Sequence, residues 1–300
     1  MRSQRAMVSQ GVMVSQGVMV SQGGIVSQRA LQRLVLQPQQ RCDRTLTLTA
    51  EQTHYLTRVL RLKPLAHFIA LLPTAPDSGL ELGTGGETWL AQLTETGAEL
   101  LEPLEVRSEL PIPVTLLLAL PKGNGFDEVV RQVTELGVSC IVPVISDRTL
   151  LQPSANKVER WRKIAQEATE QCERQQVPMI LDPLSWQQSL TQLAQIAGKE
   201  VSSAHAQGES AQGESAQGQF FCWARGQSPS LLQVLSQAVH HNSTLTSIAI
   251  ALGPEGGWSD REVAMAQQAG WQTVSLGSRV LRAVTAPTAA MAIVSAVLEK

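Results

Sequence analysis

From residue 112 onward, short apolar runs alternate with longer segments of helical periodicity. Six continuous apolar runs have the length and composition of buried strands, and they lie at 114–120, 140–145, 177–181, 220–224, 247–252 and 273–276. In the first intervening segment Phe126, Val129 and Val133 recur at helical spacing, and Gly137 stands where that helix should end. Strands that alternate with helices predict an α/β domain whose mostly parallel sheet has helices on both faces.

The preceding part of the chain, 30–108, contains shorter runs with period-two alternation, separated by Pro and Gly clusters. Such runs lie at 45–48, 68–72 and 88–93, and they predict a small β-barrel. A proline-containing stretch follows this region, so we expect the second domain to span 112–300.

One amphipathic segment, 51–64, lies between two of these runs. A short helix there would turn Leu56 and Val59 inward and Arg58 and Arg61 outward. Between positions 33 and 63 six basic side chains stand against two acidic ones, a local charge of about +4. The basic excess fits either an ordinary solvated face or a surface that contacts phosphates.

Two stretches consist of tandem repeats without a periodic apolar face. Residues 1–29 repeat a hexad of the type Met-Val-Ser-Gln-Gly-Val, and we expect a disordered extension there. Residues 202–219 contain Ala-Gln-Gly-Glu-Ser repeats, and we expect a surface insertion without chemistry.

The 24 basic and 26 acidic residues give a net charge of −2, so the charge of the whole chain does not indicate nucleic-acid binding. A nucleic-acid site would have to be a local basic patch. The four cysteines form no C-x-x-C pair and the five histidines have no metal-ligand spacing. We therefore expect no metal site and a reducing compartment, the cytoplasm. No apolar run approaches the ~20 residues of a membrane span, so no membrane association is expected.

Two apolar runs near the C-terminus break into glycine where the chain should leave the sheet. The first is followed by Gly-Pro-Glu-Gly-Gly at 253–257, and Ser259 and Glu262 then form a capping box that begins a helix, with Val263, Ala266 and Ala269 on its inner face. Neither the dinucleotide nor the P-loop pattern is present. An ordinary turn would explain one such loop, but two suggest one composite pocket at the edge of the sheet.

The residues 252–259, together with 275–282, Thr285 and Ala286, resemble the paired C-terminal signature of the RsmE family. Matches upstream at 120–123, 134–137 and 167–174 extend the resemblance over about the last two-thirds of the chain. These SPOUT-class enzymes methylate N3 of a uridine in 16S ribosomal RNA with S-adenosylmethionine. The resemblance implies a SPOUT trefoil knot, an N-terminal PUA-like RNA-binding domain, a homodimer, and 16S RNA or the small ribosomal subunit as partner.

The same resemblance implies roles for individual residues. Donor binding would fall to the backbone of the two loops, at Leu252, Gly253, Pro254, Glu255, Gly256, Gly257, Leu276, Gly277, Val280 and Leu281. Arg282 and Arg279 are candidates to stabilise the uracil anion, with structural salt bridging as the rival role. RNA contacts would come from Arg33, Arg58, Arg61, Lys63, Lys122, Gln171 and Arg174, the last three alternatively facing a partner subunit.

One position departs from the family. Val284 stands where members usually carry an acid. This departure leaves open a catalytically silent RNA-binding homologue. Another SPOUT activity, such as ribose 2'-O-methylation, is a separate alternative that would share the donor site but not the PUA-like domain.

Overall fold

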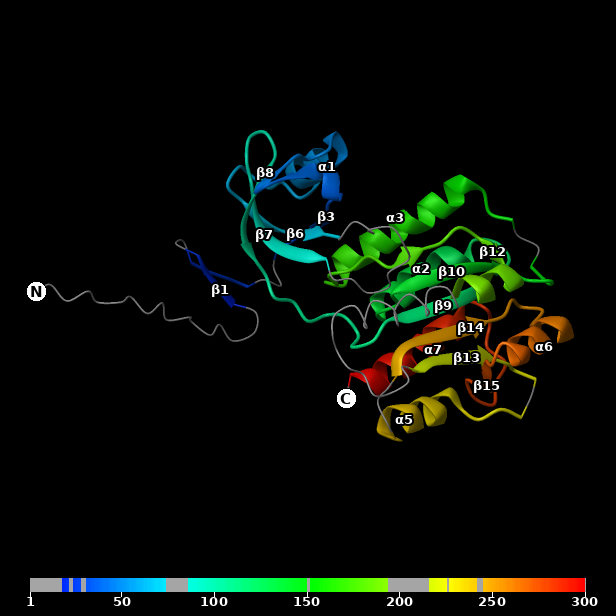
Figure 1. Ribbon diagram of the computed structural model, residues 1–300. Helices are drawn as coiled ribbons and strands as arrows, with labels where there is room; N and C mark the ends of the chain where they lie inside the picture. Colours follow the sequence, from blue (N-terminus) through cyan, green and yellow to red (C-terminus); the bar gives the residue numbers. More distant parts are fainter. Residues whose placement is uncertain are drawn as a thin grey trace, which may run out of the picture.

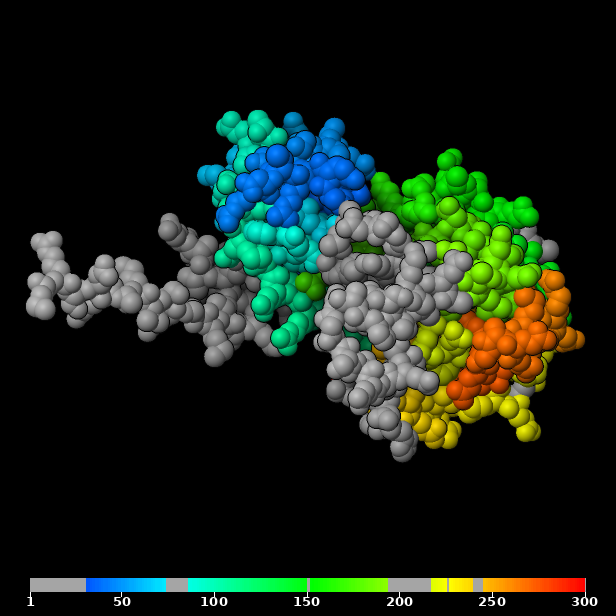
Figure 2. Space-filling view, viewed as in Figure 1, coloured from blue at the N-terminus to red at the C-terminus, as the bar shows by residue number. Residues whose placement is uncertain are grey.

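The computed structural model describes residues 31–73, 86–149, 152–193, 216–225, 227–241 and 245–299, and the backbone of 18–21 and 24–27. These residues form two large sheets with their helices and a separate two-stranded hairpin (Figure 1). In the space-filling view the part coloured blue to cyan forms a lobe beside the part coloured green to red (Figure 2). The change of sequence pattern thus coincides with a change of sheet.

The larger sheet has seven strands in the order β11-β10-β9-β14-β13-β15, with β12 beside β10. Its strands are β9 (Val114–Ala119), β10 (Cys140–Ile145), β11 (Met179–Ile180), β12 (Leu184–Ser185), β13 (Ala216–Cys222), β14 (Leu245–Leu252) and β15 (Gln272–Val274). All its pairings are parallel. The predicted α/β fold with a mostly parallel sheet is confirmed.

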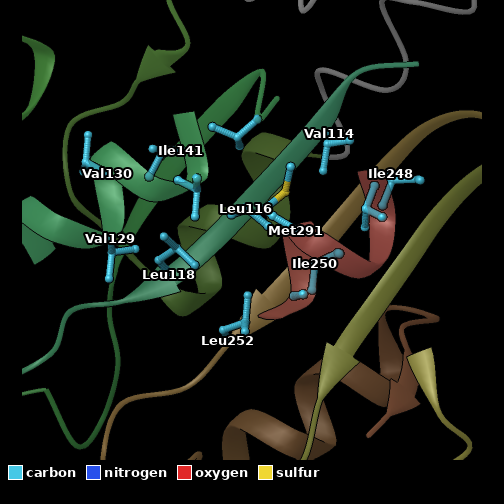
Figure 3. Packing of buried hydrophobic residues seen from close by; sticks show 14 of the residues in the cluster. Val114, Leu116, Leu118, Val129, Val130, Ile141, Ile248, Ile250, Leu252 and Met291 are labelled. Atoms are coloured by element: carbon cyan, nitrogen blue, oxygen red, sulfur yellow. The ribbon is translucent and has the colours of Figure 1, made fainter. Parts of the chain in front are cut away.

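Helices cover both faces of this sheet, because alternate residues of β9 and β14 are buried on opposite sides. The helices are α2 (Gly125–Glu135), α3 (Ala155–Gln171), α5 (Leu231–His241), α6 (Asp260–Gln268) and α7 (Thr285–Leu298), and 186–193 is also helical. Leu116 and Ile250 pack with α2 and with Met291 of α7 (Figure 3). Leu117 and Ala251 pack on the other face with Trp186 and with α6. Burial of this kind stabilises by about 25 cal/mol per Å² of apolar surface.

Two helix ends follow the sequence closely. The capping box of α6 is present, since Glu262 N donates to Ser259 Oγ and Ser259 N donates to the Glu262 carboxylate. Gly137 and Gly270 take positive φ values of 93° and 81° just beyond α2 and α6. The inner face of α6 was predicted one turn too long, because Ala269 is exposed at its end.

The smaller sheet has six strands in the order β3-β6-β7-β8-β5-β4. They are β3 (Arg33–Val35), β4 (Arg41–Cys42), β5 (Thr45–Leu46), β6 (His67–Leu72), β7 (Glu87–Leu93) and β8 (Ala98–Pro103), with the short helix η2 (Pro38–Gln40). Every pairing is antiparallel except β3 with β6. The core of this sheet includes Leu56, Phe68 and Leu100.

The segment predicted as one amphipathic helix divides into α1 (Ala50–His54) and a π-helical turn, η3 (Tyr55–Val59). A π-turn adds a residue per turn and so rotates the residues after it relative to an α-helix. Leu56 is buried as predicted, but Val59 is 58% exposed. The prediction that Val59 points inward is wrong for this reason.

Helix α3 and the turn that follows it join the two parts of the molecule through contacts with the N-terminal sheet and α1. Lys163 Nζ pairs with Glu51 at 2.9 Å, and Arg33 Nη2 pairs with Glu173 at 2.9 Å. Between them Val35 N donates to Glu170 Oε1 at 2.8 Å. Burial raises the pKa of Glu170, although this hydrogen bond works in the opposite direction. The N-terminal sheet is thus fixed on α3.

The two repeat segments lie mostly outside the described residues. Within 1–29, β1 (Val18–Ser21) and β2 (Gly24–Ser27) pair as an antiparallel hairpin, and the expected disorder of this segment stays a prediction. The expected insertion 202–219 overlaps β13, whose residues 216–219 pair with β14. Residues 216–219 thus belong to the sheet, and 202–215 lie outside the described residues. Among the described residues, no helix is both long and apolar enough to cross a membrane.

Candidate functional site

Five loops gather at one edge of the larger sheet, because parallel strands direct all their carboxyl ends to the same side. They follow β9, β10, β13, β14 and β15. Both glycine segments singled out by the sequence, 253–257 and 275–282, belong to this group. The edge therefore brings together residues that are far apart in the chain.

The loop after β14 is shaped by its glycines. Gly257 has φ +70°, and a Cβ built on it would meet no heavy atom within 4 Å. A Cβ on Gly253 would instead lie 3.0 Å from Nε1 of Trp258, whose indole packs against Trp186 and Phe221. That Nε1 is buried and has no hydrogen-bond partner among the described residues. Gly253 thus admits the indole, while Gly257 leaves open space beside the backbone.

Two neighbouring loops hold the same glycine loop in place. The Glu255 carboxylate accepts a hydrogen bond from Lys122 N at 3.1 Å, which ties the loop to the one after β9. Arg148, from the loop after β10, donates to the Gly256 carbonyl at 2.6 Å. Its stem covers Gly256, since a Cβ there would lie 3.3 Å from Arg148 Cδ. Glu255 and Arg148 therefore hold the glycine loop against the loops after β9 and β10.

Glu262 locks the start of α6 to the loop after β10. The residue is fully buried, and its carboxylate accepts hydrogen bonds at 2.8 Å from Ser259 N and from Asp147 N. Asp147 in turn accepts bonds from Arg261 and from the Ser259 hydroxyl, and these bonds lower the pKa of Asp147. The sequence predicted the cap of α6 but not this second partner, because a local motif contains no information about a residue 115 positions away.

Glu262→Ala should reduce the free energy of unfolding by roughly 2–4 kcal/mol, because two backbone N–H groups lose their acceptor. Chemical denaturation followed by circular dichroism measures the change. Glu128→Ala is the matched control, since Glu128 is exposed and bonds to Arg131 and Gln132 of its own helix. A loss of equal size in both variants would contradict the proposed role of Glu262.

The loop after β15 is anchored at both ends and exposed in the middle. Ser275 N donates to the Pro229 carbonyl at 2.9 Å, and Gly277 takes φ +120° with no heavy atom near its Cβ direction. Val280 is 79% exposed. At the far end the Arg282 carbonyl accepts the N–H groups of residues 285 and 286, which fixes Arg282 at the start of α7.

Arg279 and Arg282 both have exposed side chains. Neither forms an ion pair with any residue in the described ranges, so the structural salt-bridge role finds no support there. Both guanidinium groups therefore remain available to an anion at this edge.

The loop after β13 is a part of the site that the sequence did not reveal. Since β13 lies between β14 and β15, its carboxyl end emerges between the two glycine loops. The strand was predicted, but its position in the sheet was not readable from its residues. Cys222 ends this strand, and burial raises the pKa of its thiol to about 12. The thiol is thus protonated at neutral pH and is not a nucleophile.

The residues expected to contact RNA fall into two groups. Arg58, Arg61, Lys63, Lys122 and Gln171 are exposed. Arg33 and Arg174 form the second group, because their side chains are used inside the fold.

Arg33 is 9% exposed and pairs with Glu173. Arg174 is 3% exposed, and its guanidinium binds Glu109 and the carbonyls of Thr134 and Val138. Nothing in the sequence around these two arginines distinguishes them from exposed ones. Within the described ranges, no cluster of three or more His, Cys, Asp or Glu side chains is arranged to hold a metal ion.

Comparison with known proteins identifies relatives that match most of this chain. The model of the RNA methyltransferase domain matches residues 108–295. Ribosomal RNA small subunit methyltransferase E of Synechocystis is 43% identical over 89% of this chain and 78% of its own length. The Bacillus subtilis protein of the same name is 28% identical over 84% of this chain and 90% of its own.

Among solved structures, the Neisseria gonorrhoeae enzyme of that name, bound to S-adenosyl methionine, is similar with a TM-score of 0.66 and 26% identity. The match covers 89% of this chain and 97% of that one.

Proposed function

This chain belongs to the RsmE family of ribosomal RNA small subunit methyltransferases, and on that premise we propose that it methylates N3 of a uridine in 16S ribosomal RNA with S-adenosylmethionine. The observation that carries the proposal is the pair of glycine loops at one edge of the parallel sheet. Gly257 and Gly277 both leave open space beside the backbone there, so the residues present fit a nucleoside that is held by main-chain groups.

The donor supplies an electrophilic methyl group on a sulfonium when it is bound. The backbone of Leu252–Gly257 and of 276–281 would hold its adenine and ribose, with Arg148 and Glu255 keeping the first loop in position. An in-line displacement leaves the protein chiefly the task of orienting the two reactants.

The acceptor side requires a positive charge. N3 of uracil reacts after losing its proton, and the resulting anion is stabilised by a nearby cation. Arg282 is our first candidate, because the start of α7 fixes its backbone, and Arg279 is the second. Both approach the sheet edge from the loop after β15.

Several properties of the family are part of the same proposal. The segment around 275–281 would be threaded through a trefoil knot of the SPOUT type, and residues 30–108 would form a PUA-like barrel. The active form would be a homodimer in the cytoplasm, acting on 16S RNA or on the small subunit. The parallel sheet and the adjoining six-stranded sheet support this arrangement.

Mass spectrometry of 16S RNA nucleosides from cells with and without this chain tests the proposal. Loss of one 3-methyluridine from cells lacking the chain is the expected result. If a 2'-O-methylated nucleoside is lost instead, the target is the ribose 2'-oxygen and not N3. An unchanged profile, together with RNA binding by the purified chain, would favour a silent RNA-binding protein.

Val284 bears directly on the silent alternative. Its side chain lies over the start of α2, since a Cβ on Gly125 would meet Val284 Cγ1 at 2.6 Å, and it packs against the core below α7. Val284 thus has a packing role in this chain.

Val284→Glu should leave turnover within a few-fold of the wild type and lower stability by about 1 kcal/mol, because an apolar contact is lost. Single-turnover methylation of small subunits measures the first effect and thermal unfolding the second. A gain of tenfold or more, about 1.4 kcal/mol of barrier, would show that the family's acid is required for chemistry and that the wild type is impaired.

A further inference from the structure

The segment 58–65, which runs from the end of η3 toward β6, combines several local features that the fold does not require. It begins at the end of a π-helical turn, a form that is frequently found at functional sites. It then contains two non-glycine residues with left-handed backbone, Arg61 at φ 56° and Leu65 at φ 71°. Such conformations are costly for a residue with a side chain and persist where the surroundings enforce them.

The backbone of Leu65 is held from both sides. Leu65 N donates to the Leu93 carbonyl at 2.8 Å, and the Leu65 carbonyl accepts from Gln92 Nε2 at 3.2 Å. The side chain nevertheless projects into solvent and is 70% exposed. Glycine would satisfy the same hydrogen bonds without backbone strain, so the folded chain gains nothing from leucine here.

Apolar and cationic side chains are interleaved along this segment. Val59 and Leu65 are two of the most exposed large apolar side chains among the described residues. Arg58, Arg61 and Lys63 are exposed beside them, and none pairs with an acidic residue in the part of the chain that the structure describes. By contrast, Arg33 and Arg41 of the same sheet are paired with acids. Arg44, in the turn between β4 and β5, is a further exposed arginine without an ion pair among the described residues, so segment 58–65 holds three of the four such cations between residues 33 and 72.

We propose that segment 58–65 binds unpaired nucleotides of the RNA, with its three cations on phosphates and Val59 and Leu65 packed against exposed base faces. The inference rests on the proposed function and specifies which part of the RNA this domain recognises. In an A-form duplex the base faces are stacked and hidden, so apolar side chains find a partner only in loops, bulges and ends. Cations alone would serve a duplex equally well.

Binding measurements at several salt concentrations separate the two kinds of contact. The full chain is titrated with two RNAs of equal length, one a fully paired hairpin and one with an unpaired internal loop. Leu65→Gly and Val59→Thr should each weaken binding of the looped RNA about fivefold or more at every salt concentration, with an unchanged salt slope and little effect on the paired RNA. Arg58→Ala with Lys63→Ala should flatten the salt slope by about two phosphate contacts on both RNAs.

The variants are chosen so that misfolding cannot imitate the result. Leu65→Gly suits the left-handed backbone and should unfold at the wild-type temperature or above it. Leu232→Ala is the control for an exposed apolar residue elsewhere, on α5, and should bind both RNAs as the wild type does.

Three outcomes would overturn the inference. If Leu65→Gly and Val59→Thr bind the looped RNA with wild-type affinity, these two side chains make no apolar contact with it. Equal weakening on both RNAs would show that base faces are not what these residues touch. If either variant sediments differently from the wild type in the absence of RNA, the surface is instead covered by a second copy of the chain.

The methylation assay on small subunits, run in parallel, keeps this inference apart from the proposed function. If the wild type forms 3-methyluridine while Leu65→Gly keeps full affinity, only the inference fails. If the wild type forms none, the proposed function fails whatever the binding data show.

Discussion

Gly257→Val should weaken binding of S-adenosylmethionine by at least about a hundredfold, which corresponds to roughly 2.8 kcal/mol. Gly257 has φ +70° and open space in its Cβ direction, so a branched side chain would both strain the loop and fill the space beside the backbone. Isothermal titration calorimetry of the folded variant measures the loss.

Gly270→Val is the matched control for this prediction. Gly270 also has a positive φ, 81°, and nothing within 4 Å of its Cβ direction, but it precedes β15 and so lies at the opposite end of the strands from the glycine loops. It should lose similar stability and keep its donor affinity. Equal donor affinity in both variants would exclude the loop 253–257 from the donor site.

At the neighbouring position the expected mechanism differs. Valine at Gly256 would press on the Arg148 stem and disturb the hydrogen bond from Arg148 to the Gly256 carbonyl. Arg148→Ala should then reproduce part of the Gly256→Val defect, whereas it should not reproduce that of Gly257→Val.

Arg282→Ala should lower the rate of methyl transfer by about 10²–10³-fold while leaving donor affinity within twofold. The cation stabilises charge that develops on the acceptor, so its loss acts on kcat more than on donor binding. Single-turnover assays with small subunits, with donor affinity measured separately, give the two quantities.

Two further variants make the test of Arg282 specific. Arg282→Lys should recover part of the rate because it restores a positive charge, and Arg279→Ala should cost less if Arg282 is the principal cation. If Arg279→Ala lowers the rate more than Arg282→Ala does, Arg279 is the principal cation. A rate unchanged in both single variants would remove this loop from acceptor stabilisation.

The family resemblance rested on loops whose residues lie next to one another in sequence, and the comparisons confirm it. The same local character explains why the cap of α6 at Ser259 and Glu262 and the end of α2 at Gly137 were predictable. A cap or a stop depends on residues within four positions, so sequence order already places the partners together.

Whether a residue expected to contact RNA would be buried was harder to predict from the sequence. Arg58 lies in η3 and Arg174 three residues after the end of α3, but Arg174 is buried against Glu109 and Arg58 is exposed. The difference depends on an acid 65 positions earlier in the chain. Val59 was misjudged because a π-turn changes the helical phase without any signal in the apolar pattern.

The sequence by itself determined the types of the elements, their approximate bounds, the local caps and the two glycine loops, because each depends on short-range periodicity and backbone preference. Only the tertiary structure decided the order of the strands, which places the Cys222 end of β13 between the two glycine loops. It also decided the hydrogen bond from Asp147 N to the Glu262 carboxylate. Strand order is set by how all the apolar faces are buried together, and no single segment contains that information.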